Sequence, residues 1–332
     1  MAHRPITVRI ARGFGSLLLG LALVQATAST AGAQDYPNRP VKIIVPAAPG
    51  GALDTISRLL AQTVSQQSHQ KFFVENKPGA NWIIGMDTTA KSAPDGYTLL
   101  FIADSGLTVI PFISSHMPLD PLKDLEPISP VTTAPFVLLV NPSLPVKSVA
   151  DLVAYARAHP GKLNHGSNSA TTILVSELFK QQAKIDFVDI NFHGASEAIA
   201  ATQAGTTQMC FVDLGSATGA IQSKTLRPLA LTSPQRYPLA PDIPTFVESG
   251  LRNVAATSLT LVMGPRNIPR DIVKKLGVDF RTALNDPDVA ARLRSMGQVV
   301  DDASAAQTAK DLVSTARQWQ VLIKERNIQF GH

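Results

Sequence analysis

Short apolar runs alternate with amphipathic stretches along most of the chain, and this alternation restricts the possible folds more than any other feature. Residues 41–45 form an apolar run, and the apolar positions over 56–64 then follow helical spacing. Further apolar runs at 72–74 and 97–102 are bounded by turn sequences of Asn, Pro, Gly and Asp. Strands that alternate with helices predict βαβ units and an α/β fold with a largely parallel sheet.

A second series of the same elements begins at Phe136, the first residue of the apolar run 136–140. Ser148 is expected to cap a helix that ends at the sequence His-Pro-Gly, and two more strand-like runs follow at 207–212 and 226–232. This second series predicts another α/β unit.

Beyond Pro265 the pattern changes to long helices, which have no strands of their own to cover. They must therefore pack on an earlier sheet, most simply the first. The sequence predicts two α/β lobes, the second inserted within the first: residues 34–135 with 256–332 form lobe 1, and residues 136–255 form lobe 2. A cleft between two lobes is a common place for a small ligand.

The N-terminus has the organisation of a cleavable secretory signal. Three arginines precede the apolar run 14–24, and residues 31–33 supply the small Ala-Gly-Ala sequence that a signal peptidase recognises. The apolar run is shorter than the roughly 20 residues that span a bilayer, which argues against a membrane anchor. We therefore expect residues 1–33 to be a signal peptide and the mature protein to be periplasmic.

Charge and cysteine content exclude several classes of protein. Cleavage after residue 33 would remove three arginines and no acidic residue, so the formal charge of +5 would fall to +2. The mature chain has no cationic run of the kind that binds nucleic acid. Cys210, the single cysteine, lies in an apolar run and is interpreted as a small buried side chain rather than a reactive thiol.

Enzyme motifs are absent from the sequence. The segment 166–170 does not fit the Gly-x-Ser-x-Gly elbow of a hydrolase, and no zinc-protease, Cys-x-x-Cys or phosphate-loop motif occurs. We predict no catalytic residue, no cofactor and no metal. His165 and His193 lie near loops that could form a pocket, and they act either as sensors of ligand charge or as ordinary satisfied polar residues.

Collinear segments over the whole mature chain resemble one known family. They are residues 36–46 with 49–51 and Asp54, 74–80, 93–100, 140–143, 160–164, 226–233 and 241–245. These segments resemble those of Bug-type receptors, the extracytoplasmic solute receptors of tripartite tricarboxylate transporters. Each match is short, but their order and spread make the resemblance specific.

The resemblance implies a type II periplasmic-binding-protein fold in which two α/β lobes close on a small organic carboxylate. It implies a monomer that is not an enzyme and that delivers its ligand to the membrane subunits of the transporter. A receptor that reports to a signalling partner is the alternative, and a periplasmic hydrolase is a weaker one.

The first pocket loop implied by the resemblance contains Ala48, Gly50, Gly51 and Asp54. Glycines between a strand and a helix let the main chain approach a ligand, and the helix N-terminus favours a carboxylate. The alternative is that the Gly-Gly sequence is only a tight turn.

The second loop is polar and again precedes a helix. Ser167, Asn168, Ser169 and Thr171 are expected to contact the ligand, so that two helix N-termini would face it. The alternative is capping of the helix by Thr171 or Thr172.

Further positions complete the predicted site. Ala103 and Ser105 follow the third strand, where the neighbouring Asp104 would repel a carboxylate. Asp213 and His193 are placed at the pocket of lobe 2 by the resemblance, with helix capping as an equal alternative for Asp213.

Departures from the family pattern suggest a bulkier ligand. Ala47 and Ala48 stand where relatives often have an aromatic residue, the loop at Ser167 is about two residues shorter, and Ile173 replaces a common histidine. The segment 192–194 reads Phe-His-Gly in place of Tyr-Lys-Gly. We predict an aromatic acid or a longer dicarboxylate, with hinges near 134–135 and 255–256.

Overall fold

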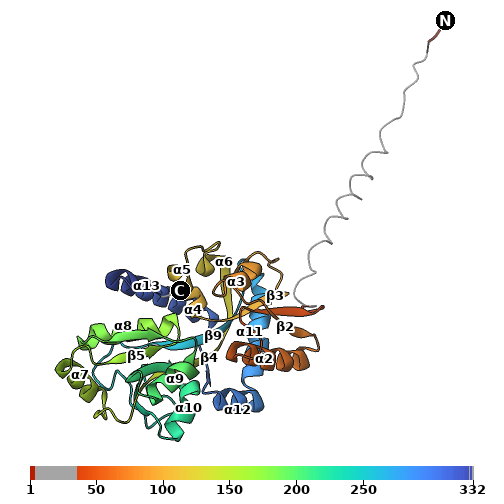
Figure 1. The fold of residues 1–332 in the computed structure, drawn as a ribbon. Helices are drawn as coiled ribbons and strands as arrows, with labels where there is room; N and C mark the ends of the chain where they lie inside the picture. The colour runs from red at the N-terminus through yellow and green to blue at the C-terminus, as the bar shows by residue number, and fades with distance from the viewer. Residues whose placement is uncertain (4–35, 329, 331–332) are drawn as a thin grey trace. The chain divides into compact units, whose positions relative to one another are not determined.

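The computed structural model of the chain describes residues 1–3, 36–328 and 330 (Figure 1). The expected signal peptide falls almost entirely outside these residues. The chain divides into two units, Met1–Asn38 and Arg39–His332, and the fold and the candidate site both belong to the second. None of the described helices combines the length and the apolar character that a membrane span requires.

The first sheet begins with three parallel strands, β1 (Val41–Val45), β2 (Phe72–Asn76) and β3 (Thr98–Ala103). β9 (Thr257–Pro265) lies antiparallel between β3 and β4 (Leu125–Val140), which gives the order β2-β1-β3-β9-β4. The short strand β10 (Val299–Val300) pairs with β4. The helices in these parts of the chain are α2 (Ala52–Ser68), α3 (Ile83–Ala90), α4 (Ser105–Thr108), α5 (Ile110–Ile113), α6 (Pro121–Asp124), α11 (Arg270–Leu284), α12 (Pro287–Ser295) and α13 (Ala305–Arg326).

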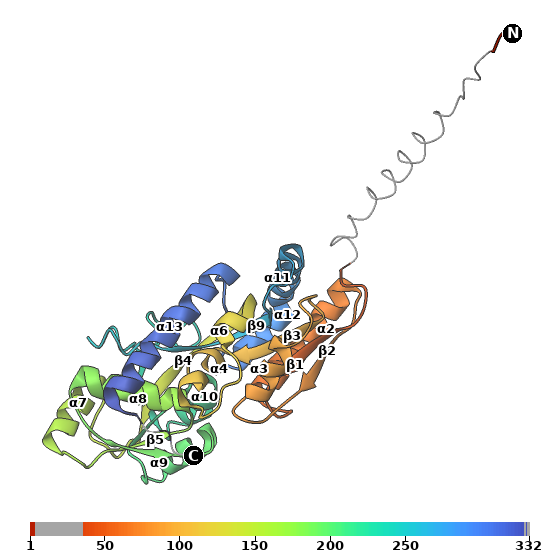
Figure 2. The same ribbon diagram turned by 90° about the horizontal axis from the view of Figure 1, so that it is seen from above.

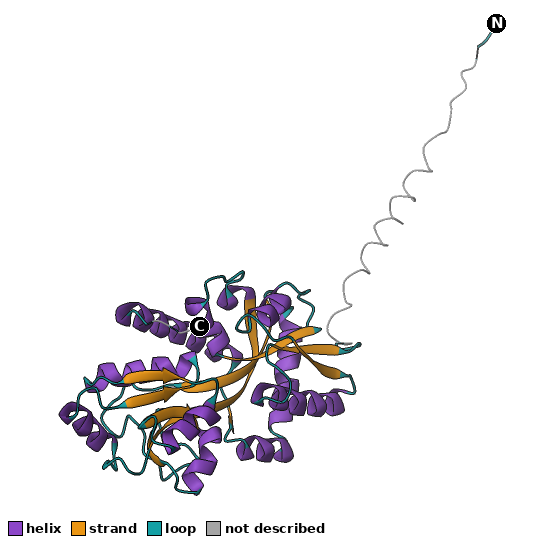
Figure 3. Ribbon diagram, in the orientation of Figure 1, coloured by secondary structure: helices purple, strands orange, loops and turns teal. Residues whose placement is uncertain are grey.

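The second sheet is built on the other half of β4. β7 (Met209–Asp213) and β8 (Arg227–Leu231) pair antiparallel with residues 136–140 of β4, and β5 (Asn164–Ser167) and β6 (Val188–Asn191) extend the sheet beyond β7. Its helices are α7 (Val149–Ala158), α8 (Ala170–Ala183), α9 (Ala195–Gln203) and α10 (Leu214–Gln222). Figure 3 shows the strands of both sheets with helices around them.

β4 is longer than the sequence suggests, because it starts at Leu125 and not near Phe136. Prolines at 127, 130 and 135 argue against a strand here, since proline cannot donate to a sheet ladder. The pairing with β9 shifts register between Pro127 and Ser129 and again between Pro130 and Thr132. These irregularities accommodate two of the prolines, so that one continuous strand runs through both lobes.

Two chain segments connect the lobes side by side. One is β4 at Pro135 and Phe136, and the other is the segment 255–256 that leads into β9. The buried Thr232 of lobe 2 joins them: its hydroxyl accepts the Phe136 N–H at 2.9 Å and donates to the Ala256 carbonyl at 2.6 Å. Tyr237 of lobe 2 adds a second link close to this point, because its hydroxyl donates to the Thr133 carbonyl at 2.7 Å.

The register of β4 shows that the carboxyl ends of the parallel strands in the two lobes face one another. Ala103, the last residue of β3, is opposite Thr260, which is opposite Thr132 of β4. Asp213, the last residue of β7, is opposite Phe136 of β4. Both strands thus run toward the same short stretch of β4, whose two ends, Thr132 and Phe136, are four residue steps or about 13 Å apart. This is the expected arrangement for loops that meet across a cleft.

A buried polar network stabilises the second lobe. The main-chain N–H of Phe211 donates to Nε2 of His165 at 3.0 Å, so the proton of this fully buried ring lies on Nδ1 and is donated to Asp189 at 2.6 Å. Asp189 also accepts hydrogen bonds from Ser176 and from Lys180. His165 is therefore a core residue with both ring nitrogens hydrogen-bonded. This is one of the two roles expected for it from the sequence.

Cys210 is buried on β7, as the sequence predicts. Burial raises the pKa of its thiol to about 12. At neutral pH the thiol is therefore protonated and is a poor nucleophile.

The C-terminal helix α13 contacts elements of both lobes. Trp319 and Leu322 pack with Val109 of lobe 1 and with Leu174 and Leu178 of α8 in lobe 2. An ion pair of 2.9 Å between Arg326 and Glu177 extends this contact. Figures 1 and 2 both show α13 beside α4 and α8. The helix was expected to cover the first sheet, but it also packs against a helix of the second lobe.

Candidate ligand-binding site

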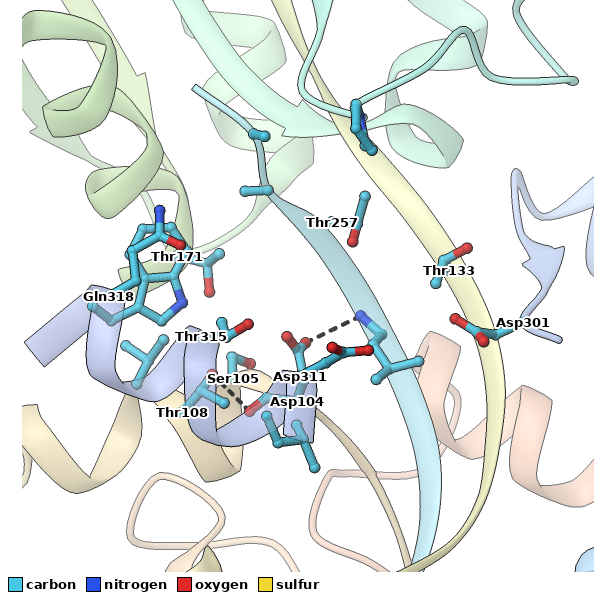
Figure 4. Close-up of a pocket in the computed structure, with 17 residues that line it drawn as sticks. Asp104, Ser105, Thr108, Thr133, Thr171, Thr257, Asp301, Asp311, Thr315 and Gln318 are labelled. Carbon is cyan, nitrogen blue, oxygen red and sulfur yellow. Dashed lines mark hydrogen bonds between the residues drawn. The ribbon is translucent and has the colours of Figure 1, made fainter. Parts of the chain in front are cut away.

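A cavity of about 300 Å³ lies where the two lobes and α13 meet (Figure 4). Its walls come from the β3–α4 junction, the connecting segments around Thr133 and 255–257, the N-terminal turn of α8, and one face of α13. A volume of this size holds a small organic molecule. The position is the one at which the carboxyl ends of the strands converge.

Two of the residues predicted from the sequence line this cavity, Ser105 from lobe 1 and Thr171 from lobe 2. Ser105 is the first residue of α4, directly after β3, and Thr171 lies in the first turn of α8. Both are half-buried, and Figure 4 shows them on the same side of the cavity. Of the residues predicted from the sequence, each lobe thus contributes one hydroxyl group to the cavity.

Asp104 lines the cavity next to Ser105. Its carboxylate accepts the main-chain N–H of Leu259 at 3.1 Å. Burial raises the pKa of the Asp104 carboxyl to about 7, although hydrogen bonds from main-chain N–H groups favour the charged form. Near neutral pH this group is therefore present in both its charged and its neutral form.

The raised pKa of Asp104 predicts a pH-dependent stability. The folded protein retains a proton that the unfolded chain loses near pH 4, so the free energy of unfolding should fall as pH rises from 4 to 7. Asp104→Asn keeps an acceptor for Leu259 and removes the titration. We expect this variant to gain about 2 kcal/mol at pH 8 and little at pH 4.

Urea unfolding at pH 4 and pH 8 measures this difference, with Asp242→Asn at an exposed position as the matched control. A gain of equal size at both pH values would show that the carboxyl of Asp104 is not destabilised by its surroundings.

The glycine loop after β1 does not line the cavity. The N–H of Gly50 donates to the carboxylate of Asp54 at 2.9 Å, and Arg58 and Asn76 donate to the same carboxylate. The hydrogen bond from Arg58 is the largest influence on the pKa of Asp54; it outweighs burial and lowers the pKa to about 2. In this conformation Asp54 shapes the loop, while Ala48, Gly50 and Gly51 are exposed at the carboxyl edge of β1.

In the second loop the helix cap is Ser169 and not Thr171 or Thr172. Its hydroxyl accepts the N–H of Thr172, whose own hydroxyl accepts the N–H of Ser169, so the two residues form a capping box. This arrangement leaves Thr171 free to face the cavity. Ser167 is fully buried and hydrogen-bonds with Asn191, while Asn168 has a buried side-chain oxygen without a partner among the described residues.

The remaining predicted positions lie outside the cavity wall. Asp213 caps α10 by accepting the N–H of Ser216 at 2.9 Å and its hydroxyl at 2.8 Å, which is the alternative role considered for it. Ala103 is buried at the end of β3. His193 is exposed, and its main-chain N–H donates to the carboxylate of Glu197.

The face of α13 that lines the cavity was not predicted as part of the site. Asp311, Thr315, Gln318 and Trp319 follow one another at helical spacing along this face. The helical spacing of Leu312, Ala316, Trp319 and Ile323 in the sequence predicts only the apolar stripe of a packed helix. The signal that was missed is the set of polar residues directly beside the apolar stripe. In a helix that packs only on a sheet, such polar residues face solvent, whereas here they face the cavity.

The charge of the cavity is negative. Asp104, Asp301 and Asp311 line it, and none of the lining residues is lysine, arginine or histidine. Within residues 36–328, no group of three or more His, Cys, Asp or Glu side chains is arranged to hold a metal ion. A ligand in this cavity would therefore meet hydroxyl, amide and indole groups as donors and carboxylates as acceptors.

Comparison with protein families decides the class of protein. Residues 56–328 match the model of the tripartite tricarboxylate transporter family receptor. The chain belongs to this receptor family. The resemblance seen in the sequence motifs is therefore confirmed.

Individual relatives support the same assignment over most of the chain. A UPF0065 protein of Bordetella pertussis is 33% identical over 279 residues, which are 83% of this chain and 86% of that protein. A solved structure described as a periplasmic transporter is 32% identical, with a TM-score of 0.75, and covers 89% of this chain and 99% of its own. Rpa4515 of R. palustris, solved with adipate, is 28% identical, with a TM-score of 0.76 and the same coverage.

The family and the fold together establish the general role of the protein. It is a solute-binding receptor with two α/β lobes, of the type found in the periplasm, and not an enzyme. The predicted fold class is confirmed.

Proposed function

We propose that this receptor captures a small organic carboxylate between its two lobes and delivers it, as a monomer, to the membrane subunits of a tripartite tricarboxylate-type transporter. The observation that carries the proposal is the cavity in which Ser105 of one lobe and Thr171 of the other face the same space. A ligand that accepts hydrogen bonds from both hydroxyl groups would hold the lobes together. The adipate bound to the similar Rpa4515 supports a carboxylate as the ligand class.

Closure would be a hinge motion around the two connecting segments. The lobes we propose are residues 34–135 with 256–332, and residues 136–255, which places the hinge at the hydrogen bonds of Thr232 to Phe136 and Ala256. Nine of the twelve residues predicted from the sequence are exposed or half-buried and would line the cleft around the cavity, with Asp54, Ala103 and Ser167 buried behind them. The N-terminus of α2 and that of α8 would be oriented toward a carboxylate. Export by cleavage after residue 33 would place the receptor in the periplasm.

The loop sequences favour an aromatic acid or a longer dicarboxylate within this class. Alanines at positions 47 and 48 leave more room than an aromatic side chain would, and Ile173 makes the second loop more apolar than a histidine would.

A thermal-shift screen of residues 34–332 against aliphatic and aromatic mono- and dicarboxylates tests the proposed function. A ligand that binds only the folded state stabilises it by about 2.7 kcal/mol at a hundredfold excess over Kd. We expect a clear rise in Tm with one group of related acids, each recovered chemically unchanged. Chemical conversion of the acid, or no rise in Tm with any acid after the protein has been unfolded and refolded to remove carried-over ligand, would contradict the proposal.

A further inference from the structure

Trp319 of α13 contributes to the cavity wall a side chain whose polar group has no hydrogen-bond partner among the described residues. Its side chain lines the cavity and only 4% of the residue is exposed. None of the hydrogen bonds among the described residues involves its indole N–H. The indole nitrogen is not one of the fully buried unpartnered side-chain atoms of the described residues, so it is accessible to a ligand group that accepts its hydrogen bond.

Two neighbours of Trp319 add to the same wall. Thr315 and Gln318 line the cavity about one turn or less away on α13, and neither side chain is hydrogen-bonded within the part of the chain that the structure describes. Figure 4 shows both around the space that Thr171 and Ser105 also border. The helix therefore presents an indole, a hydroxyl and an amide to one small volume.

Carboxylates in the same cavity restrict what can accept these hydrogen bonds. Asp104, Asp301 and Asp311 also line it, with no lysine, arginine or histidine among the lining residues to balance them. A second carboxylate of a ligand would lie close to these like charges, of which Asp104 and Asp301 are half-buried and Asp311 is exposed, and their repulsion disfavours it. A hydroxyl group avoids this conflict because it accepts from the indole and donates to an aspartate.

We infer that the face of α13 centred on Trp319 is a specificity-determining wall of the ligand site, and that it selects an organic acid with an uncharged hydroxyl-bearing tail over a dicarboxylate. This inference rests on the proposed function and narrows it. The carboxylate of the ligand accepts hydrogen bonds from Ser105 and Thr171, and its hydroxyl tail lies against Trp319 and Thr315 of α13. Of the two ligand classes that the loop sequences favour, the aromatic acid is the one that agrees with this charge pattern.

Matched ligands test the inference. In 4-hydroxybenzoate, benzoate and terephthalate the same ring carries a hydroxyl, a hydrogen or a second carboxylate, and 6-hydroxyhexanoate, hexanoate and adipate repeat the comparison on an aliphatic chain. Titration calorimetry at pH 8 should give binding in at least one series, with the hydroxy acid about tenfold or more tighter than the diacid. Trp319→Phe keeps the ring packing and should weaken the hydroxy acid about tenfold while leaving the unsubstituted acid almost unchanged.

Tryptophan fluorescence supplies a second readout, because the chain contains only Trp82 and Trp319. Trp82 does not line the cavity. The hydroxy acid should change the emission of the wild type and of Trp82→Phe, but not that of Trp319→Phe. If Trp319→Phe fails to fold, Thr315→Val is expected to reduce the preference for the hydroxyl in the same direction.

Three results would overturn the inference: a diacid that binds as tightly as the hydroxy acid, a folded Trp319→Phe variant with unchanged affinity, or a receptor that binds neither series while another acid raises its Tm. If no acid of any kind binds, the proposed function itself fails, so the two failures are distinguishable.

Discussion

Replacement of Asp189 by alanine is expected to lower the free energy of unfolding by about 3–5 kcal/mol, because it removes one partner from a buried ionic network. Asp189 accepts hydrogen bonds from His165, which is fully buried, and from Lys180, which is 7% exposed. Without it, the imidazole N–H would have no partner and the Lys180 ammonium would keep only Glu177 as an ion-pair partner, beside the ring of Phe187. Burying such groups without partners is among the most destabilising changes a substitution can make.

Urea unfolding at pH 7 measures this loss, with Asp302→Ala as the matched control. Asp302 forms an ion pair with Arg281 but its side chain is 90% exposed, so its removal should cost less than about 1 kcal/mol. Equal losses in the two variants would show that the network contributes no more than a surface ion pair.

The network also predicts how the difference in unfolding free energy between the wild type and Asp189→Ala depends on pH. Burial alone would raise the pKa of Asp189, but hydrogen bonds from His165 and Lys180 outweigh it and hold the pKa below its usual value. A carboxylate with a lowered pKa stabilises the fold above the pKa of the unfolded state and loses this effect as pH falls. The gap between wild type and Asp189→Ala should therefore narrow below about pH 4.

Much of the fold could be predicted because local sequence signals and tertiary packing agree. The helix after Ser148 has the expected cap, since the serine hydroxyl accepts the N–H of Asp151. β1, β2 and β3 occur as parallel strands where the apolar runs predict them. The first half of β4 was missed because its prolines argue against a strand, and only the pairing with β9 shows how register shifts admit them.

The site was only partly predictable because the motifs lie on loops, whereas one wall of the cavity belongs to a distant helix. Ser105 and Thr171 were found because each follows a strand and opens a helix. Thr315 and Trp319 lie far along the chain from both, and helical periodicity alone assigns them to an ordinary packed face. The contact of α13 with α8 is a tertiary property that no local pattern encodes.

The hydroxyl groups of Ser105 and Thr171 are predicted to contribute jointly to ligand affinity, because they face the same cavity from opposite lobes. A hydrogen bond to a charged group contributes about 1.5–3 kcal/mol, so the double variant Ser105→Ala, Thr171→Val should bind the acid chosen in the thermal-shift screen at least about a hundredfold more weakly. Thr282→Val, Ser295→Ala removes two hydroxyls on exposed parts of the surface and is the matched control.

Titration calorimetry of that acid into the wild type and these two variants is the most direct test that this protein is a receptor with its site between the lobes. We predict one ligand bound per wild-type chain, unchanged affinity in the control variant, and near-complete loss of binding in the Ser105→Ala, Thr171→Val variant. Unchanged affinity in that folded variant would contradict the account, because the ligand would then bind outside the cavity that joins the two lobes.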